Sequence, residues 1–188
     1  MFTHIGGRAW SLVILLVCPH VVGQEKPGPA KTNPMALGGS LPAVFVSVLP
    51  DVKAKSHVPI LLPSELPEPI ARAKHAVITA ETDNYTIALY FKLGVGFSAY
   101  AASFSGGPSP KFSLRELPNV SEVKLAHGFR GFFRPIFCGG SCAPVNLWWE
   151  DGGILYQIQL RLSSSVSEQD QEKTIEAVAN SAILAGPR

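Results

Sequence analysis

The sequence predicts an α+β domain, in which one C-terminal helix packs on a curved, mainly antiparallel sheet of several strands. Three observations support this fold class. Several short segments alternate apolar and polar residues, as half-buried strands do. Some are joined by tight turns such as Asp151-Gly152-Gly153, where glycine accepts the positive φ that the turn requires. Only the C-terminal segment spaces its apolar residues as a helix does.

Residues 1–23 have the pattern of a secretory signal peptide. Arg8 supplies a positive start, and the apolar run that ends at Val17 is too short to span a bilayer, which needs about 20 residues. Cleavage is expected near Gln24, and an uncleaved anchor or a buried strand is the alternative. Cys18 follows a valine where a small residue would be expected, which argues against lipid attachment.

Residues 24–40 are rich in proline, glycine and lysine and predict a flexible linker before a single domain at 41–188. Within the domain, Ala43 to Leu49 is predicted as the first strand and Val58 to Leu62 as a possible second.

The next segments predict a proline-rich loop followed by strands. Three prolines from Pro63 onward oppose regular structure, so an ordered loop with one helical turn near Ile70 to Lys74 is expected. His75 to Glu81 and Tyr85 to Leu93 form a predicted hairpin, and Phe97 to Phe104 a further strand that the "SGGPSP" segment ends. In the second strand of the hairpin one face is apolar, made of Tyr85, Ile87, Leu89, Phe91 and Leu93.

Two more hairpins are expected toward the C-terminus. Val120 to Ala126 pairs with Phe129 to Phe137, and Val145 to Glu150 pairs with Ile154 to Leu162. In the last strand the residues predicted to face the core are Ile154, Tyr156, Ile158, Leu160 and Leu162.

The C-terminal helix has clear end signals. Ser167 is a good N-cap, and Glu168 and Asp170 fall in the first turn, where the helix dipole favours negative charge. Gly186-Pro187 ends the helix. Its apolar stripe consists of Ile175, Val178, Ala179, Ala182 and Ile183.

Charge and motifs exclude several functions. The chain carries 16 basic and 14 acidic residues without a basic cluster, so nucleic acid and anionic membranes are poor candidate partners. It lacks a nucleophile elbow, a phosphate loop, a zincin helix and a calcium loop. The sequence therefore favours a non-enzymatic protein with no cofactor and no metal.

Isolated titratable residues leave one catalytic alternative. His57, His75 and His127 lie at predicted strand edges or turns, where solvated imidazoles are expected. Glu150 and Asp151 could form the acid–base pair of an envelope hydrolase, although acidic residues at a hairpin tip also serve as turn formers.

Cys138 and Cys142 predict a disulfide in an oxidising compartment. The glycines that follow Cys138 allow the close approach that so short a loop needs. A thiol–disulfide redox protein or sensor is the alternative, although the pair lacks the usual two-residue spacing. A metal site is disfavoured because His127 is the only further ligand candidate nearby.

Trp148 and Trp149 are adjacent in a predicted strand, so their side chains should point to opposite faces. The outward indole, together with Tyr156, is the candidate ligand-contact platform, because aromatic rings stack on many ligands. Covering the edge of a twisted sheet is the alternative role.

Several segments resemble a family of uncharacterised exported bacterial proteins. They are "VPILLPSELP", "NYTIALYF", "VKLAHGFRGFF", "CGGSCAP", "LWWEDGGILYQI" and "AVANSAI". The W-x-x-x-G-x-x-Y segment from Trp149 to Tyr156, with the later Ala-Asn-Ser, is also similar to a domain of unknown function in envelope and sporulation-associated proteins. That domain is similar to lipoprotein-carrier folds, in which a curved antiparallel sheet cradles a helix.

The resemblance implies an exported bacterial protein and adds no catalytic residue. Relatives can carry further cysteines where this chain reads "YAASFSG", so a function that needs a second bridge is not expected here. The sequence thus predicts a secreted or periplasmic domain that binds an unknown protein or a small apolar ligand at the cell envelope, with no transmembrane span after signal cleavage.

Overall fold

The computed structural model describes residues 39–109, 113–139 and 141–188. The predicted signal peptide and all but the last two residues of the predicted linker lie outside these ranges. The helices are α1 (Ala43–Val46), α2 (Leu49–Lys55) and α3 (Glu168–Ala185), with short 3₁₀ turns η1 (Ile70–Arg72), η2 (Gly96–Ala99), η3 (Leu114–Glu116) and η4 (Ala126–Gly128). The strands are β1 (His75–Glu81), β2 (Asn84–Tyr90), β3 (Tyr100–Pro108), β4 (Ser121–Lys124), β5 (Arg130–Arg134), β6 (Phe137–Cys138), β7 (Cys142–Ala143), β8 (Val145–Asp151) and β9 (Ile154–Leu160).

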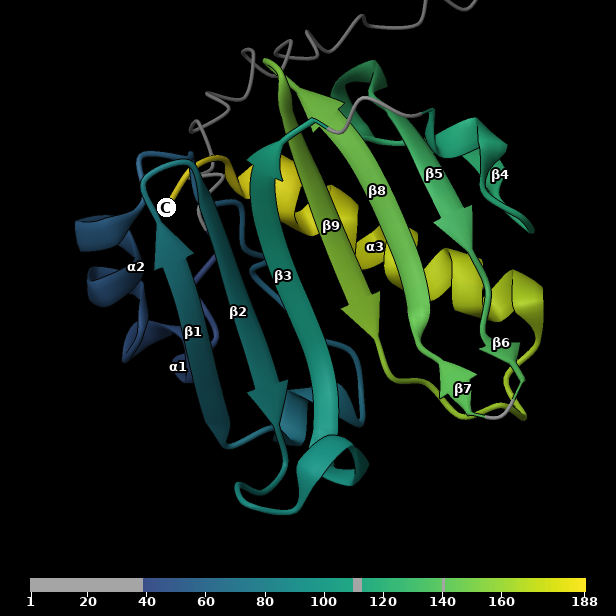
Figure 1. The fold of residues 1–188 in the computed structure, drawn as a ribbon, viewed down its shortest axis with the longest axis horizontal. Coiled ribbons are helices and arrows are strands. Elements are labelled where there is room, and N and C mark those ends of the chain that lie inside the picture. Colours follow the sequence, from purple (N-terminus) through teal and green to yellow (C-terminus); the bar gives the residue numbers. More distant parts are fainter. Residues whose placement is uncertain (1–38, 110–112, 140) are drawn as a thin grey trace, which may run out of the picture. The chain divides into compact units, whose positions relative to one another are not determined.

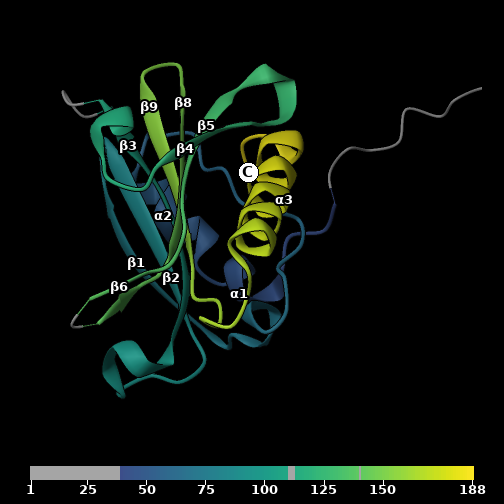
Figure 2. The ribbon, with the colours of Figure 1, turned by 90° about the vertical axis from the view of Figure 1, so that its right-hand side faces the viewer.

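The main sheet has seven strands in the order β1-β2-β3-β9-β8-β5-β4, all antiparallel. Figure 1 shows the strands side by side with α3 behind them, and Figure 2 shows α3 along one face. This arrangement confirms the predicted α+β class. The sheet is not strongly curled, so the predicted curvature is not confirmed.

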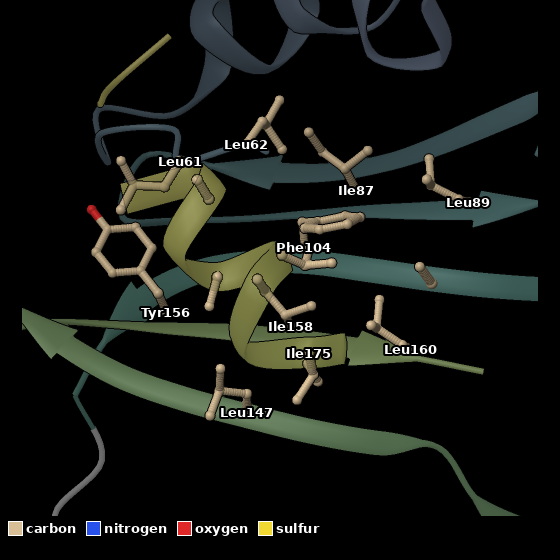
Figure 3. Packing of buried hydrophobic residues seen from close by; sticks show 14 of the residues in the cluster. Leu61, Leu62, Ile87, Leu89, Phe104, Leu147, Tyr156, Ile158, Leu160 and Ile175 are labelled. Atoms are coloured by element: carbon tan, nitrogen blue, oxygen red, sulfur yellow. The ribbon is translucent and has the colours of Figure 1, made fainter. Parts of the chain in front are cut away.

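The core lies between the sheet and α3. Alternate residues of the central strands point toward the helix, and Figure 3 shows Phe104 and Ile158 on the strands near Ile175 of α3. The predicted inward residues Tyr156, Ile158 and Leu160 are all buried. The helix buries its whole predicted stripe, made of Ile175, Val178, Ala179, Ala182 and Ile183.

Local signals fix the ends of α3 and the last hairpin as expected. The Ser167 hydroxyl accepts a hydrogen bond from the Asp170 amide at 3.2 Å, which caps the helix. Gly152 and Gly153 have φ values of 58° and 81°, so the β8–β9 turn uses the left-handed conformations that favour glycine.

The prediction of a strand over Ala43 to Leu49 is wrong, because this segment forms α1 and the start of α2. Pro42 precedes α1 and Pro50 lies in the first turn of α2, positions where the missing N–H removes no helical hydrogen bond. Each helix buries one apolar residue, Phe45 and Val52. Helical packing against the sheet therefore overrides the local β propensity of the valines.

Other predicted boundaries shift. Val58 to Leu62 is not a strand and makes one isolated bridge, between Leu61 and Pro187, rather than a ladder. The strand from Tyr85 ends at Tyr90, which leaves Leu93 50% exposed instead of inward-facing. The predicted helical turn is present as η1.

The strand predicted over Phe97 to Phe104 begins at Tyr100 and continues to Pro108, through the glycines expected to end it. A Cβ atom at Gly106 would lie 2.8 Å from a ring carbon of Tyr85 and 3.1 Å from one of Tyr156. The glycine is needed for close packing inside the sheet, which is the other common role of glycine in a strand.

Candidate functional site

The structure separates the aromatic residues predicted to contact a ligand. Trp149 and Tyr156 face α3, where their rings stack with centroids 5.4 Å apart and both residues are almost fully buried. The Tyr156 hydroxyl donates a hydrogen bond to the Pro59 carbonyl at 3.1 Å. Both residues therefore belong to the core in this structure.

Trp148 points to the opposite face, as strand alternation requires. Its neighbours across the sheet are Phe132 and Gln157, and the Arg134 guanidinium lies 5.2 Å from its ring centroid. These side chains lie around the indole, and the residue is only 6% exposed. The ligand-contact role of the three aromatic residues stays a prediction. Both tryptophans are covered by their neighbours, whereas Tyr156 lines a cavity of about 480 Å³ beside Pro59 and Ile183.

The predicted disulfide pair lies at bonding distance. Cys138 and Cys142 face each other in the β6–β7 hairpin, with their sulfur atoms 2.05 Å apart and their α-carbons 4.0 Å apart. Both cysteines are exposed. The hairpin points away from α3 (Figure 2).

Of the remaining candidates for chemistry, His127 and Asp151 line the same cavity as Tyr156. Glu150 accepts a hydrogen bond from the Ser109 hydroxyl at 3.2 Å, and Asp151 ends β8 at the turn. His57 and His127 are exposed and His75 is half-buried. Within the described ranges, no group of three or more His, Cys, Asp or Glu side chains could hold a metal ion.

A concentration of exposed apolar side chains marks one end of the sheet. The β2–β3 connection carries Leu93, Val95 and Phe97, which are 50%, 43% and 60% exposed, and the disulfide hairpin carries Phe137, which is 56% exposed. Isolated exposed apolar residues are ordinary, but clusters of them often mark binding surfaces.

Two cavities of about 500 and 560 Å³ lie between the β2–β3 connection and the disulfide hairpin. They share Phe97, Ser141, Cys142 and Ala143 in their linings, and we call them together the loop cleft. The smaller cavity extends to Arg161 and the segment after β9, and the larger one is bounded by Phe137.

Contacts with Tyr100 and Arg161 hold Phe97 in place. Its ring stacks on Tyr100 with centroids 5.2 Å apart and planes 9° apart, and the Arg161 guanidinium lies 5.7 Å from the Phe97 centroid. Arg161 also donates hydrogen bonds of 2.7 Å to the carbonyls of Phe97 and Ser98. The β2–β3 connection is therefore tied to the end of β9, which reduces the ordering cost of binding.

A polar network anchors Tyr100 on the sheet face opposite α3. Its hydroxyl donates to the Ser103 hydroxyl at 2.8 Å, and the Gln159 amide carbonyl accepts from both hydroxyls at 3.2 Å. Gln159 in turn donates to the fully buried Asn146 at 2.7 Å. Burial raises the pKa of Tyr100 to about 12, because it penalises the phenolate.

The loop cleft is lined mainly by uncharged residues. Among the described residues that line it, only Arg161 is charged. The cleft can therefore take an apolar body between the two phenylalanines, with a guanidinium at one side that would favour a negative group.

Comparisons of the sequence with family models and curated proteins, and of the structure with solved structures, find no match. The family resemblance therefore stays a prediction. In the part of the chain that the structure describes, no helix is long and apolar enough to cross a membrane.

Sequence reasoning missed Phe97 and Phe137 as site residues because it placed both in strands. A signal was present for each. Phe97 follows "LGVG", where two glycines oppose a regular strand, and Phe137 directly precedes the short disulfide loop. Apolar residues beside such segments are candidates for exposure at a rigid loop.

Proposed function

We propose that this chain is a secreted or periplasmic bacterial domain that binds an apolar ligand, or an apolar segment of a partner protein, in the loop cleft without catalysing a reaction. The observation that carries the proposal is the pair of exposed phenylalanines, Phe97 and Phe137, which line cavities that adjoin a disulfide hairpin. Apolar walls with few polar groups are typical of ligand sites.

Export is supported by the cysteine pair and by the signal-like N-terminus. Disulfides persist mainly outside the reducing cytosol, and Cys138 and Cys142 lie at bonding distance. The disulfide restrains the hairpin that presents Phe137, as Arg161 restrains the connection that presents Phe97. Both walls of the cleft are thus ordered before a ligand arrives.

The binding proposal predicts that Phe97→Ala and Phe137→Ala each weaken binding of the anionic naphthalene dye 1-anilinonaphthalene-8-sulfonate by about tenfold or more. Burying a phenylalanine side chain against a ligand is worth about 1.5–3 kcal/mol, and 1.4 kcal/mol corresponds to tenfold in affinity. Fluorescence titration of the mature protein measures the dissociation constant.

Leu184→Ala is the matched control, because Leu184 is 48% exposed on α3 and lines neither cavity of the loop cleft. Its dye affinity should equal that of the unmodified protein. Equal dye binding by all three variants would contradict the proposal, since the dye would then bind elsewhere.

A thiol–disulfide redox function is a second candidate, favoured by the exposure of both cysteines and by the position of Cys142 in the cleft wall. In this function a substrate thiolate would attack one sulfur, form a mixed disulfide and release the other cysteine as a thiolate. The cleft would then position the apolar part of the thiol substrate.

The reduction potential separates the two functions. For a structural bond that restrains the hairpin, we expect a value below about −300 mV by glutathione titration, with alkylation of free thiols and mass detection. A value near −200 mV or higher would favour the redox function, because such a bond exchanges readily with cellular thiols.

A further inference from the structure

The strand β1 forms one edge of the main sheet and is paired on one side only, with β2. Sheet edges in soluble proteins are usually protected by lysine, proline, bulges or a covering element, because an open edge can pair with another chain. The β1 sequence, "HAVITAE", contains neither lysine nor proline, and its register with β2 has no bulge. Helices α1 and α2 contact β1, but within the described ranges none of their backbone groups is hydrogen-bonded to it.

The hairpin geometry shows which backbone groups face outward. Glu81 pairs with Asn84 across a two-residue turn, so alternate residues from Glu81 back to His75 direct their N–H and C=O groups toward β2. Ala76, Ile78 and Ala80 direct theirs to the open edge. Within the described ranges, none of these three residues has a backbone hydrogen-bond partner at that edge.

The strand is close to self-complementary. Read in both directions from Ile78, it pairs Val77 with Thr79, which have similar shapes, Ala76 with Ala80, and His75 with Glu81. Lys74 precedes the strand and Asp83 follows it, so the basic end of one copy would meet the acidic end of another when two copies run antiparallel.

We propose that β1 is a dimerisation edge, which pairs antiparallel with β1 of a second copy about a two-fold axis at Ile78. In this register Ile78 faces its own equivalent, and every outward N–H of one strand meets an outward carbonyl of the other. Registers displaced from this centre leave some of those groups unpaired. A parallel pairing would place Glu81 beside Glu81 of the second copy, which is unfavourable.

The two-fold pairing would join two main sheets into one continuous sheet. It uses no residue of the loop cleft, so the binding function and the dimer can fail independently. Ala76, Ile78 and Ala80 would form the hydrogen bonds between the copies, and their side chains pack partly against the core of their own copy. Val77, which is 47% exposed, lies on the opposite face and would sit beside Thr79 of the second copy.

Exchanging the residues' charges at positions 75 and 81 tests the proposed dimer directly. Sedimentation equilibrium of the mature protein should show a monomer–dimer equilibrium. Glu81→Lys should raise the dimer dissociation constant by about tenfold or more, because both Glu81–His75 pairs across the axis lose their carboxylate. Adding His75→Glu should restore the dimer, since the charges are exchanged rather than removed. Glu116→Lys, the same change at η3, should have no effect.

A backbone variant tests the register. Ala80→Pro removes an outward N–H but none of the hydrogen bonds to β2, so it should weaken the dimer while the circular dichroism spectrum is unchanged. A wild-type monomer at every accessible concentration would overturn the proposal and indicate that α2, which lies next to β1 in Figure 1, covers the edge. Failure of the charge swap to restore the dimer would overturn it as well.

Discussion

Replacing Trp149 with alanine is expected to lower the free energy of unfolding by about 3–5 kcal/mol, the range found for large aromatic deletions in protein cores. The residue is 1% exposed, is the largest fully buried side chain among the described residues, and is stacked on Tyr156. Its indole N–H has no hydrogen-bond partner in the described part of the chain, so the loss comes from packing and burial. Urea denaturation followed by circular dichroism measures the change.

Phe137→Ala is the matched control, because this aromatic side chain is 56% exposed. Its effect on the unfolding free energy should stay within about 0.5 kcal/mol. The two variants thereby separate a core aromatic residue from a site aromatic residue. A Trp149→Ala protein of unchanged stability that no longer binds dye would contradict the core position and support the contact role that the sequence predicts for Trp149.

Elements with their own local signals were predictable from the sequence. The β1–β2 and β8–β9 hairpins follow from alternating segments joined by turn residues, and the structure pairs Glu81 with Asn84 and Asp151 with Ile154 across these turns. Helix α3 follows from the Ser167 cap and the apolar stripe. In each case the deciding interactions lie within a few residues along the chain.

Elements that depend on distant packing were not predictable. Residues 43–49 have the composition of a strand, yet Phe45 packs edge to face on Phe104 of β3, with ring centroids 5.2 Å apart. Gly106 reads as a strand breaker until the rings of Tyr85 and Tyr156 are placed beside it. Both outcomes depend on residues that are far away in sequence.

The exposure of the candidate site residues also depends on residues that are distant in sequence. Strand alternation correctly separated Trp148 from Trp149, but alternation gives a direction and not an exposure. Trp148 is buried because Arg134 and its cross-strand neighbours surround it, whereas Phe97 is exposed because the chain leaves β2 before reaching it. The loop cleft combines three separate segments, and no single segment carries a signal for it.

High pH provides the second large expected effect. Burial raises the pKa of Tyr100 and of Tyr156 from 10.0 to about 12, and raises the pKa of Tyr85 as well. A raised pKa means that the folded protein holds the phenol proton more tightly than the unfolded chain does. The resulting stability is fully present below pH 10 and is lost as the pH rises through about 12.

Unfolding free energies measured in urea from pH 9 to pH 12 should therefore fall, and Tyr100 alone accounts for about 2–3 kcal/mol of the loss, because one pKa unit equals 1.36 kcal/mol. Between pH 9 and pH 12, Tyr100→Phe should therefore lose about 2–3 kcal/mol less stability than the unmodified protein does. At neutral pH the variant is expected to be less stable, since it lacks the hydrogen bond to Ser103. The test therefore compares how steeply the unfolding free energies of the two proteins fall with pH, and not their difference at one pH. Parallel curves for the two proteins would show that Tyr100 is ionised as easily in the folded state as in the unfolded chain, and that the network with Ser103 and Gln159 does not exclude water from its hydroxyl.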